Sequence, residues 1–81
     1  MMTQVQINEK LNGVFRDIFD VPELVVGDTT TANDVEGWDS LAHVDLIVAV
    51  ESAFNVRFTT KEVKALANVG DFIRLIERRV K

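Results

Sequence analysis

Hydrophobic residues recur at intervals of three and four along several stretches of this 81-residue chain, which is the spacing of amphipathic helices. The first stretch predicts a helix over 4–19, with Thr3 as its N-cap and Pro22 just beyond its end. Its apolar stripe consists of Ile7, Leu11, Val14, Phe15, Ile18 and Phe19. Gly13 lies inside this helix, and we interpret it as a point of close packing rather than a break.

The second stretch predicts a helix from Ser40 to Phe54 or Asn55. Gly37 lets the chain turn, and either Asp39 or Ser40 can accept hydrogen bonds from the first free N–H groups. The periodicity assigns a core-facing side formed by Leu46, Ala49, Val50 and Phe54. The side expected to face solvent carries Leu41, Val44, Asp45, Val48 and Glu51, although periodicity alone allows Val44 and Val48 to be core residues nearly as well.

Two further helices are predicted from their N-terminal signals. Thr59 and Glu62 have the spacing of a capping box, which predicts a short helix from residue 60 to 65 or 66. A turn at Asn68 opens a last helix that ends near Arg79. The buried stripe of that helix is Val69, Phe72, Ile73, Ile76 and Val80. The predicted fold is an all-α four-helix bundle with three longer helices and a short third one, in one domain over 1–81.

Residues 20–39 have no helical period and form a long connection between the first two helices. Such a connection fits a compact domain if Leu24, Val26 and Val35 place their side chains on the core. A metal-loop interpretation rests on Asp28, Asn33 and Asp34. It is disfavoured because their spacing fits no EF-hand and the bidentate Glu is missing.

Charge is distributed unevenly along the chain. The segment 17–56 has nine acidic residues and no Lys or Arg, whereas the remainder has four acidic and nine basic residues. This acidic segment repels nucleic acid and attracts partner proteins with basic surfaces. The absence of cysteine rules out disulfides, and with a single histidine it argues against a zinc site.

Nothing in the sequence predicts insertion into a membrane. The chain has no run of 18 apolar residues, and residues 1–10 lack the basic-then-apolar pattern of a signal peptide. We therefore expect a cytoplasmic protein, and a monomer.

Ser40, His43 and Asp39 raise the question of a catalytic triad. A serine nucleophile needs a base within hydrogen-bond reach, an orienting group for that base and an oxyanion site. His43 should instead project from an exposed helix of a small domain without an evident pocket, and Asp39 is badly placed to orient it. We expect no catalytic residues. The positive end of the helix dipole does make Ser40 a good position for a phosphate.

The same stretch resembles the attachment site of acyl carrier proteins, in which Gly37-x-Asp39-Ser40-Leu41 opens the second helix. The resemblance extends over essentially the whole chain. It includes the chain length, the acidic loop before the serine and three later elements: Glu51-x-x-Phe54, Val56-x-Phe58 and Val69-Gly70-Asp71-x-Ile73.

The resemblance implies that Ser40 carries 4′-phosphopantetheine, transferred from coenzyme A by a phosphopantetheinyl transferase with Mg²⁺, while Asp39 supports that reaction. The thiol of the arm would hold acyl groups as thioesters. The resemblance also implies docking of acyl-transferring, ligase or synthase enzymes through basic surfaces. The contact residues would be Leu41, Val44, Asp45, Val48 and Glu51, and His43 would lie on this docking face or border the arm.

The chain departs from the common fatty-acid-synthesis carriers at Trp38, Ala42 and His43, and it lacks their denser acidic run late in the second helix, where it has Ala49-Val50-Glu51-Ser52-Ala53. These departures favour a specialised, stand-alone carrier, in fatty acid biosynthesis or in polyketide or other secondary metabolism. Two alternatives remain open. One is a peptidyl or aryl carrier domain, which shares the fold and the arm. The other is a helical interaction module that is never modified.

Overall fold

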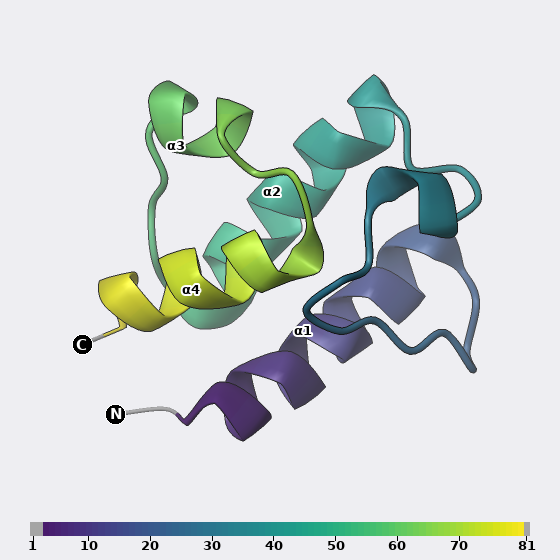
Figure 1. The fold of residues 1–81 in the computed structure, drawn as a ribbon, viewed down its shortest axis with the longest axis horizontal. Coiled ribbons are helices and arrows are strands. Elements are labelled where there is room, and N and C mark those ends of the chain that lie inside the picture. Colours follow the sequence, from purple (N-terminus) through teal and green to yellow (C-terminus); the bar gives the residue numbers. More distant parts are fainter. Residues whose placement is uncertain (1–2, 81) are drawn as a thin grey trace.

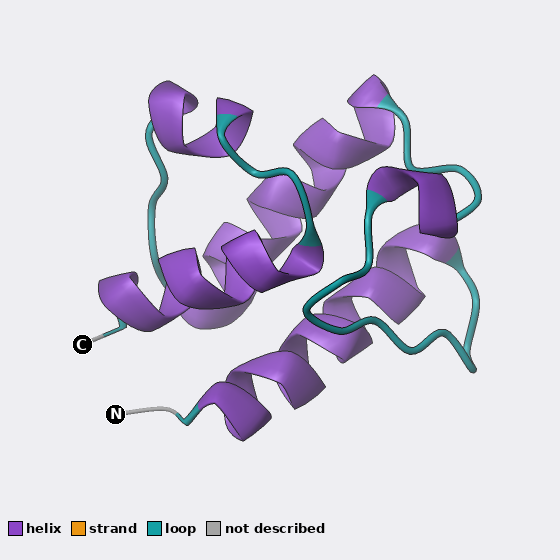
Figure 2. Ribbon diagram, viewed as in Figure 1, coloured by secondary structure: helices purple, strands orange, loops and turns teal. Residues whose placement is uncertain are grey.

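The computed structural model describes residues 3–80, and within that range the chain forms four α-helices and no strand (Figure 1, Figure 2). These are α1 (Gln4–Phe19), α2 (Ser40–Phe54), α3 (Thr60–Lys64) and α4 (Val69–Arg79). The all-α fold with a short third helix is therefore confirmed. The third helix ends at Lys64, slightly earlier than predicted.

Each helix begins at a side-chain cap that the sequence predicts. The hydroxyls of Thr3 and Thr59 accept hydrogen bonds from backbone N–H groups three residues later, in complete capping boxes. The Asn68 side chain accepts a hydrogen bond from the Asp71 N–H and so caps α4. Asn55 ends α2 in the left-handed conformation, with φ of 55°. Local hydrogen bonds thus set the helix boundaries.

The core forms where α1 packs against both α2 and α4. In Figure 1, α1 and α2 run in opposite directions. The buried apolar side chains of this core cluster are Ile7, Leu11, Phe15, Val26, Val35, Leu46, Ile47, Val50, Phe54, Val69, Phe72, Ile73 and Ile76. Leu75 is buried outside the cluster. The predicted core face of α2 left out Ile47, which is buried, and included Ala49, which is only half-buried.

The predicted role of Gly13 is wrong. A Cβ built at Gly13 meets no atom within 4 Å, so the helix continues through this position without close packing. Close packing occurs instead at Gly70, where a Cβ would lie 2.7 Å from the carbonyl oxygen of Asp28. The first turn of α4 therefore has room only for glycine at position 70.

The connection 20–39 is more ordered than its lack of periodicity predicts. It contains one turn of 3₁₀ helix at Ala32–Asp34. Val26 and Val35 are buried and Leu24 packs against the core, as expected.

Asn12, a buried residue of α1, fixes the middle of this connection. Its Oδ1 accepts from the Val26 N–H at 2.6 Å, and its Nδ2 donates to the Val26 carbonyl at 3.1 Å. Sequence reasoning missed this anchor.

The same connection is bonded to the start of α4. The N–H of Val69 donates to the Thr30 carbonyl at 2.8 Å, and the N–H of Gly70 donates to the Asp28 carbonyl at 3.1 Å. The loop therefore spans from α1 to α4 before it reaches α2.

None of the helices within residues 3–80 has the length and apolar character that a membrane span requires.

Candidate functional site

Ser40 is the first residue of α2, and its side chain is exposed. Gly37 turns the chain toward the helix with a φ of 90°, a conformation that favours glycine. Asp39 is the N-cap: its backbone is extended and its carboxylate accepts from the Ala42 N–H at 2.9 Å. Of the two capping residues that the sequence allows, the structure selects Asp39, and the Ser40 hydroxyl makes no hydrogen bond within residues 3–80.

The start of α2 suits an anion attached to Ser40. The N–H groups of Ser40 and Leu41 have no acceptor among the described residues, and they lie at the positive end of the helix dipole. Beside Ser40 is a shallow hollow of about 430 Å³. It is lined by Ala32, Trp38, Asp39, Ser40, His43 and Leu66. A phosphodiester on Ser40 fits these donors, and the hollow leaves space beside it.

His43 does not project from an exposed face as predicted. It is half-buried, and its ring lies nearly parallel to that of Trp38, with an interplanar angle of 18° and centroids 6.0 Å apart. The Trp38 Nε1–H donates to His43 Nδ1 at 3.1 Å, and Phe72 packs edge-on against the imidazole. Because Trp38 and Phe72 lie outside α2, the position of His43 on a helical wheel of α2 could not predict this packing.

These bonds also decide the triad interpretation. His43 Nδ1 is engaged by Trp38, and the Asp39 carboxylate is engaged by the backbone of α2. Among residues 3–80, no hydrogen bond joins the side chains of Ser40, His43 and Asp39 to one another; the one bond between these residues runs from the His43 backbone N–H to the Asp39 carbonyl, at 2.9 Å. The three side chains are neighbours but do not form the relay that a serine nucleophile needs.

The predicted docking residues separate into two groups. Leu41, Val44 and Val48 are 80%, 60% and 61% exposed, and Asp45 is exposed beside them. Glu51 is half-buried, and its Oε2 accepts from the Phe58 N–H at 2.8 Å. The first four residues form a free apolar strip with an acidic margin, whereas Glu51 also fixes the segment that follows α2.

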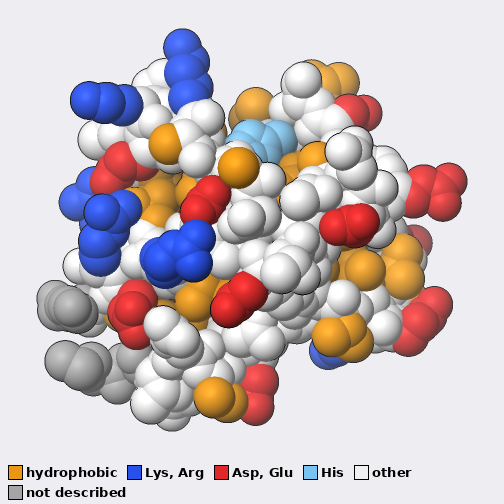
Figure 3. All heavy atoms as spheres, viewed as in Figure 1, with side chains coloured by type: hydrophobic (Ala, Val, Ile, Leu, Met, Phe, Trp, Pro, Cys, Tyr) orange, Lys and Arg blue, Asp and Glu red, His pale blue; other side chains and the backbone are white. Residues whose placement is uncertain are grey.

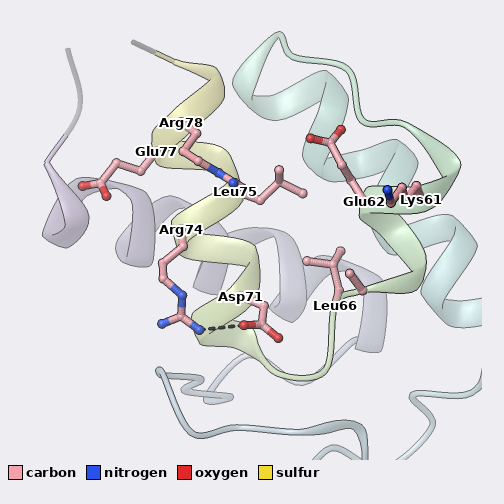
Figure 4. Close-up of a pocket in the computed structure, with 9 residues that line it drawn as sticks. Lys61, Glu62, Leu66, Asp71, Arg74, Leu75, Glu77 and Arg78 are labelled. Carbon is pink, nitrogen blue, oxygen red and sulfur yellow. Dashed lines mark hydrogen bonds and ion pairs between the residues drawn. The ribbon is translucent and has the colours of Figure 1, made fainter.

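A second hollow, of about 610 Å³, lies between α3 and α4 (Figure 4). It is lined by Lys61, Glu62, Ala65, Leu66, Asp71, Arg74, Leu75, Glu77 and Arg78. Leu66 borders both hollows, so they adjoin. The sequence did not predict this groove, because its walls come from two separate helices that meet only in the folded chain.

Two ion pairs involve residues that line the second hollow. Glu62 on α3 accepts from Arg79 on α4, and Asp71 bonds Arg74 at 2.6 Å. The Arg79 hydrogen bond and the Thr59 backbone N–H lower the pKa of Glu62 from 4.5 to about 2. The Ala67 N–H and Arg74 lower the pKa of Asp71. These contacts hold α3 against α4 and stabilise the first turn of α4.

Metal coordination has no support in the part of the chain that the structure describes. Residues 3–80 contain no group of three His, Cys, Asp or Glu side chains that could hold an ion. In the segment once considered as a metal loop, the Asp34 carboxylate accepts from the Thr31 N–H at 3.0 Å and closes the 3₁₀ turn.

The fold and the uncommitted serine at the start of α2 define a class of small helical carriers that hold a phosphate-linked group. The chain matches the family described as "Phosphopantetheine attachment site" over residues 9–76. It is 36% identical over 80 residues to the acyl carrier protein of Thermosynechococcus vestitus, covering 98% of each chain. It is 32% identical over 79 residues to that of Prochlorococcus marinus, covering 96% of this chain and 98% of the other.

Structural similarity agrees with these relationships. The solution NMR structure of the holo acyl carrier protein from Geobacter metallireducens matches with a TM-score of 0.86 and 36% identity, over 91% of this chain and 85% of that one. The chain belongs to the acyl carrier protein family. Its prosthetic group is 4′-phosphopantetheine, and like other members it carries its cargo between enzymes and is not a catalyst.

Proposed function

We propose that Ser40 is the attachment point of the phosphopantetheine arm. The observation that supports this most directly is the free Ser40 hydroxyl beside two unpaired N–H groups at the start of α2. When attached, the arm supplies a terminal thiol, which this cysteine-free chain lacks, and the thiol holds an acyl group as a thioester. The helix start holds the phosphate end by its dipole and its N–H donors.

Asp39 has a supporting role in this proposal. Its carboxylate adjoins Ser40 and fixes the first turn of α2 through the Ala42 N–H. Removing it would weaken the cap by about 1 kcal/mol and disorder the approach to Ser40. A phosphopantetheinyl transferase is the enzyme that installs the arm, and Asp39 presents the serine hydroxyl to it.

Partner enzymes dock on the exposed side of α2. Leu41, Val44 and Val48 form an apolar strip along it, and Asp45 supplies negative charge beside them. This composition suits transient contacts that basic partner surfaces find quickly and leave quickly. Glu51 adds charge at the far end of the strip, although its carboxylate is already bonded to Phe58.

The experiment is the intact mass of the folded protein after incubation with coenzyme A, Mg²⁺ and a broad-specificity phosphopantetheinyl transferase. We expect a gain of one phosphopantetheinyl group, mapped to Ser40 by peptide fragmentation. Ser40→Ala should abolish the gain without loss of helical circular dichroism, because the hydroxyl makes no structural bond among the described residues. Loading of the alanine variant would refute the assignment.

A folded wild-type sample that gains no mass would mean that this chain needs its own dedicated transferase.

The pathway is the second part of the proposal. Trp38, Ala42 and His43 surround the serine with residues that differ from those of the common fatty-acid-synthesis carriers. We therefore assign the protein to a specialised pathway with its own partner enzymes. The test is which of several acyl-transferring enzymes loads the holo protein fastest.

A further inference from the structure

Trp38 and His43 together form a flat surface next to Ser40. An indole N–H donates in the plane of its ring, so the 3.1 Å bond to His43 Nδ1 places the imidazole at the edge of the indole. The 18° interplanar angle makes the two rings nearly coplanar. Both line the hollow that contains Ser40.

The core holds this pair of rings in place from below. Trp38 packs edge-to-face on Phe15, with centroids 5.2 Å apart, and lies 6.4 Å from Phe72. The Phe72 ring also packs edge-on against the His43 imidazole, with ring centroids 6.0 Å apart. Since Phe15 and Phe72 are fully buried, the surface is rigid and prearranged.

The hydrogen bond also fixes the tautomer of the neutral imidazole. Nδ1 accepts from Trp38, so the ring hydrogen is on Nε2. Nε2 makes no hydrogen bond within residues 3–80. His43 lies three residues after Ser40, which places the two side chains on the same face of α2, within reach of one shared group.

We propose that Trp38 and His43 are an aromatic seat for the first part of the prosthetic arm. The rings pack against the geminal methyl groups of the pantetheine, and His43 Nε2–H donates to an oxygen of the phosphodiester on Ser40. The inference rests on the proposed attachment at Ser40. It assigns a function to the two positions at which this chain departs most visibly from the common carriers.

An alternative explanation is that the rings only complete the core. In that role the rings would be buried, with protein atoms on all sides and no open space beside them. The pair instead borders open space beside Ser40, and Trp38 and His43 are both only half-buried. Two half-exposed aromatic rings on the wall of a hollow are well suited to bind an apolar group with polar neighbours.

The test compares the apo and holo proteins by isotope-edited NMR, after intact mass has established attachment. We expect nuclear Overhauser effects from the two arm methyl groups to Trp38 and His43 ring protons. We also expect the Trp38 indole N–H and His43 Nε2 resonances to shift on attachment. Because the chain has one tryptophan, its fluorescence provides a second readout from the same site.

Two variants separate packing from hydrogen bonding. His43→Phe keeps a flat ring and removes both nitrogens, so the methyl contacts should persist while the ³¹P resonance of the phosphodiester moves. Val25→Ala is the control, because Val25 is 74% exposed, does not line the hollow and lies outside the docking strip. Its ring and ³¹P resonances should equal those of the wild type.

Each outcome decides between the proposals. A protein that gains the arm but shows identical ring resonances and no methyl contacts overturns the seat and leaves the attachment intact. A protein that gains the arm at a residue other than Ser40 overturns the attachment, and the seat with it. A holo His43→Phe variant with an unchanged ³¹P resonance overturns the hydrogen bond from Nε2.

Discussion

The start of α2 and the α3–α4 side of the molecule use charge in opposite ways. Around α3 and α4, acidic and basic side chains bind each other: Glu62 bonds Arg79, and Asp71 bonds Arg74. None of the nine acidic residues in segment 17–56 forms an ion pair within residues 3–80. Figure 3 shows the Lys and Arg side chains gathered over α3 and α4 on this face.

The difference separates stabilising groups from binding groups. Exposed ion pairs give modest stability and leave little charge for a partner. Unpaired carboxylates contribute no such stability, but they create the field that steers a basic partner. The Ser40 end therefore keeps its hydroxyl, its first two N–H groups and the carboxylate of Asp45 available. The following predictions test this contrast, beginning with the largest effect.

Phe72 connects the two ends, because it belongs to α4 while its ring supports Trp38 and His43. Phe72→Ala should cost about 3–5 kcal/mol of unfolding free energy, since the ring is fully buried. That is a large part of the roughly 4–12 kcal/mol expected for a domain of this length. Urea denaturation measures the loss.

Val25→Ala is the control for this prediction, because Val25 is 74% exposed and should change stability by less than about 0.5 kcal/mol. If the two variants lost equal stability, Phe72 would not be a core residue, and the Ser40 end would fold without support from α4.

Gly70 tests how closely the long connection approaches α4. Gly70→Ala should destabilise the protein by about 1–3 kcal/mol, because the new Cβ would lie 2.7 Å from the Asp28 carbonyl oxygen. Gly13→Ala has no atom within 4 Å and should stabilise the protein by about 0.5–1 kcal/mol. Thermal unfolding of both variants gives the comparison, and a stabilised Gly70→Ala would contradict the packing at this joint.

Local signals predicted the helices well. Thr3, Asp39, Thr59 and Asn68 each bond a backbone N–H within three residues, so a short stretch of sequence contains the whole interaction. The core face of α2 was harder to assign. Leu41, Val44 and Val48 are apolar yet exposed, so periodicity could not identify Ile47 as buried.

The candidate site was only partly predictable for the same reason. Ser40 and Asp39 follow from a short motif at a helix start. The pairing of Trp38 with His43 depends on Phe15 and Phe72, which reach it from distant parts of the chain. Asn12 was missed because a polar residue on an amphipathic helix is usually exposed. Its spacing of three residues from Phe15 and seven from Phe19, both in the apolar stripe, was the available signal.

Glu62 tests the paired side of the comparison through pH. Its pKa is lowered to about 2 by Arg79 and by the Thr59 N–H, so its contribution to stability is complete above pH 4.5. That contribution is lost as the pH falls from 4.5 through about 2. Glu62→Gln lacks it at every pH, so its melting temperature should decline less steeply over this range.

Arg79→Gln is the companion variant, because it removes the largest cause of the lowered pKa while retaining the carboxylate. It should flatten the same part of the profile of melting temperature against pH. Profiles of both variants parallel to that of the wild type would show that the pair does not hold α3 to α4.

Asp45 tests the unpaired side, where the expected effect is on rate and not on stability. Asp45→Lys places a positive charge in the middle of the exposed strip of α2, so basic partners should associate about two- to tenfold more slowly at low salt. The difference should fade as the ionic strength rises toward 1 M, where the Debye length is only about 3 Å. The measurement is the rate of modification by the phosphopantetheinyl transferase across this salt range.

Glu9→Lys on α1 is the control for Asp45→Lys. It changes the net charge by the same amount from another face of the chain, so its rate isolates the effect of position. Equal slowing in both variants would mean that the total charge attracts the enzyme; slowing in Asp45→Lys alone would mean that the unpaired face of α2 does.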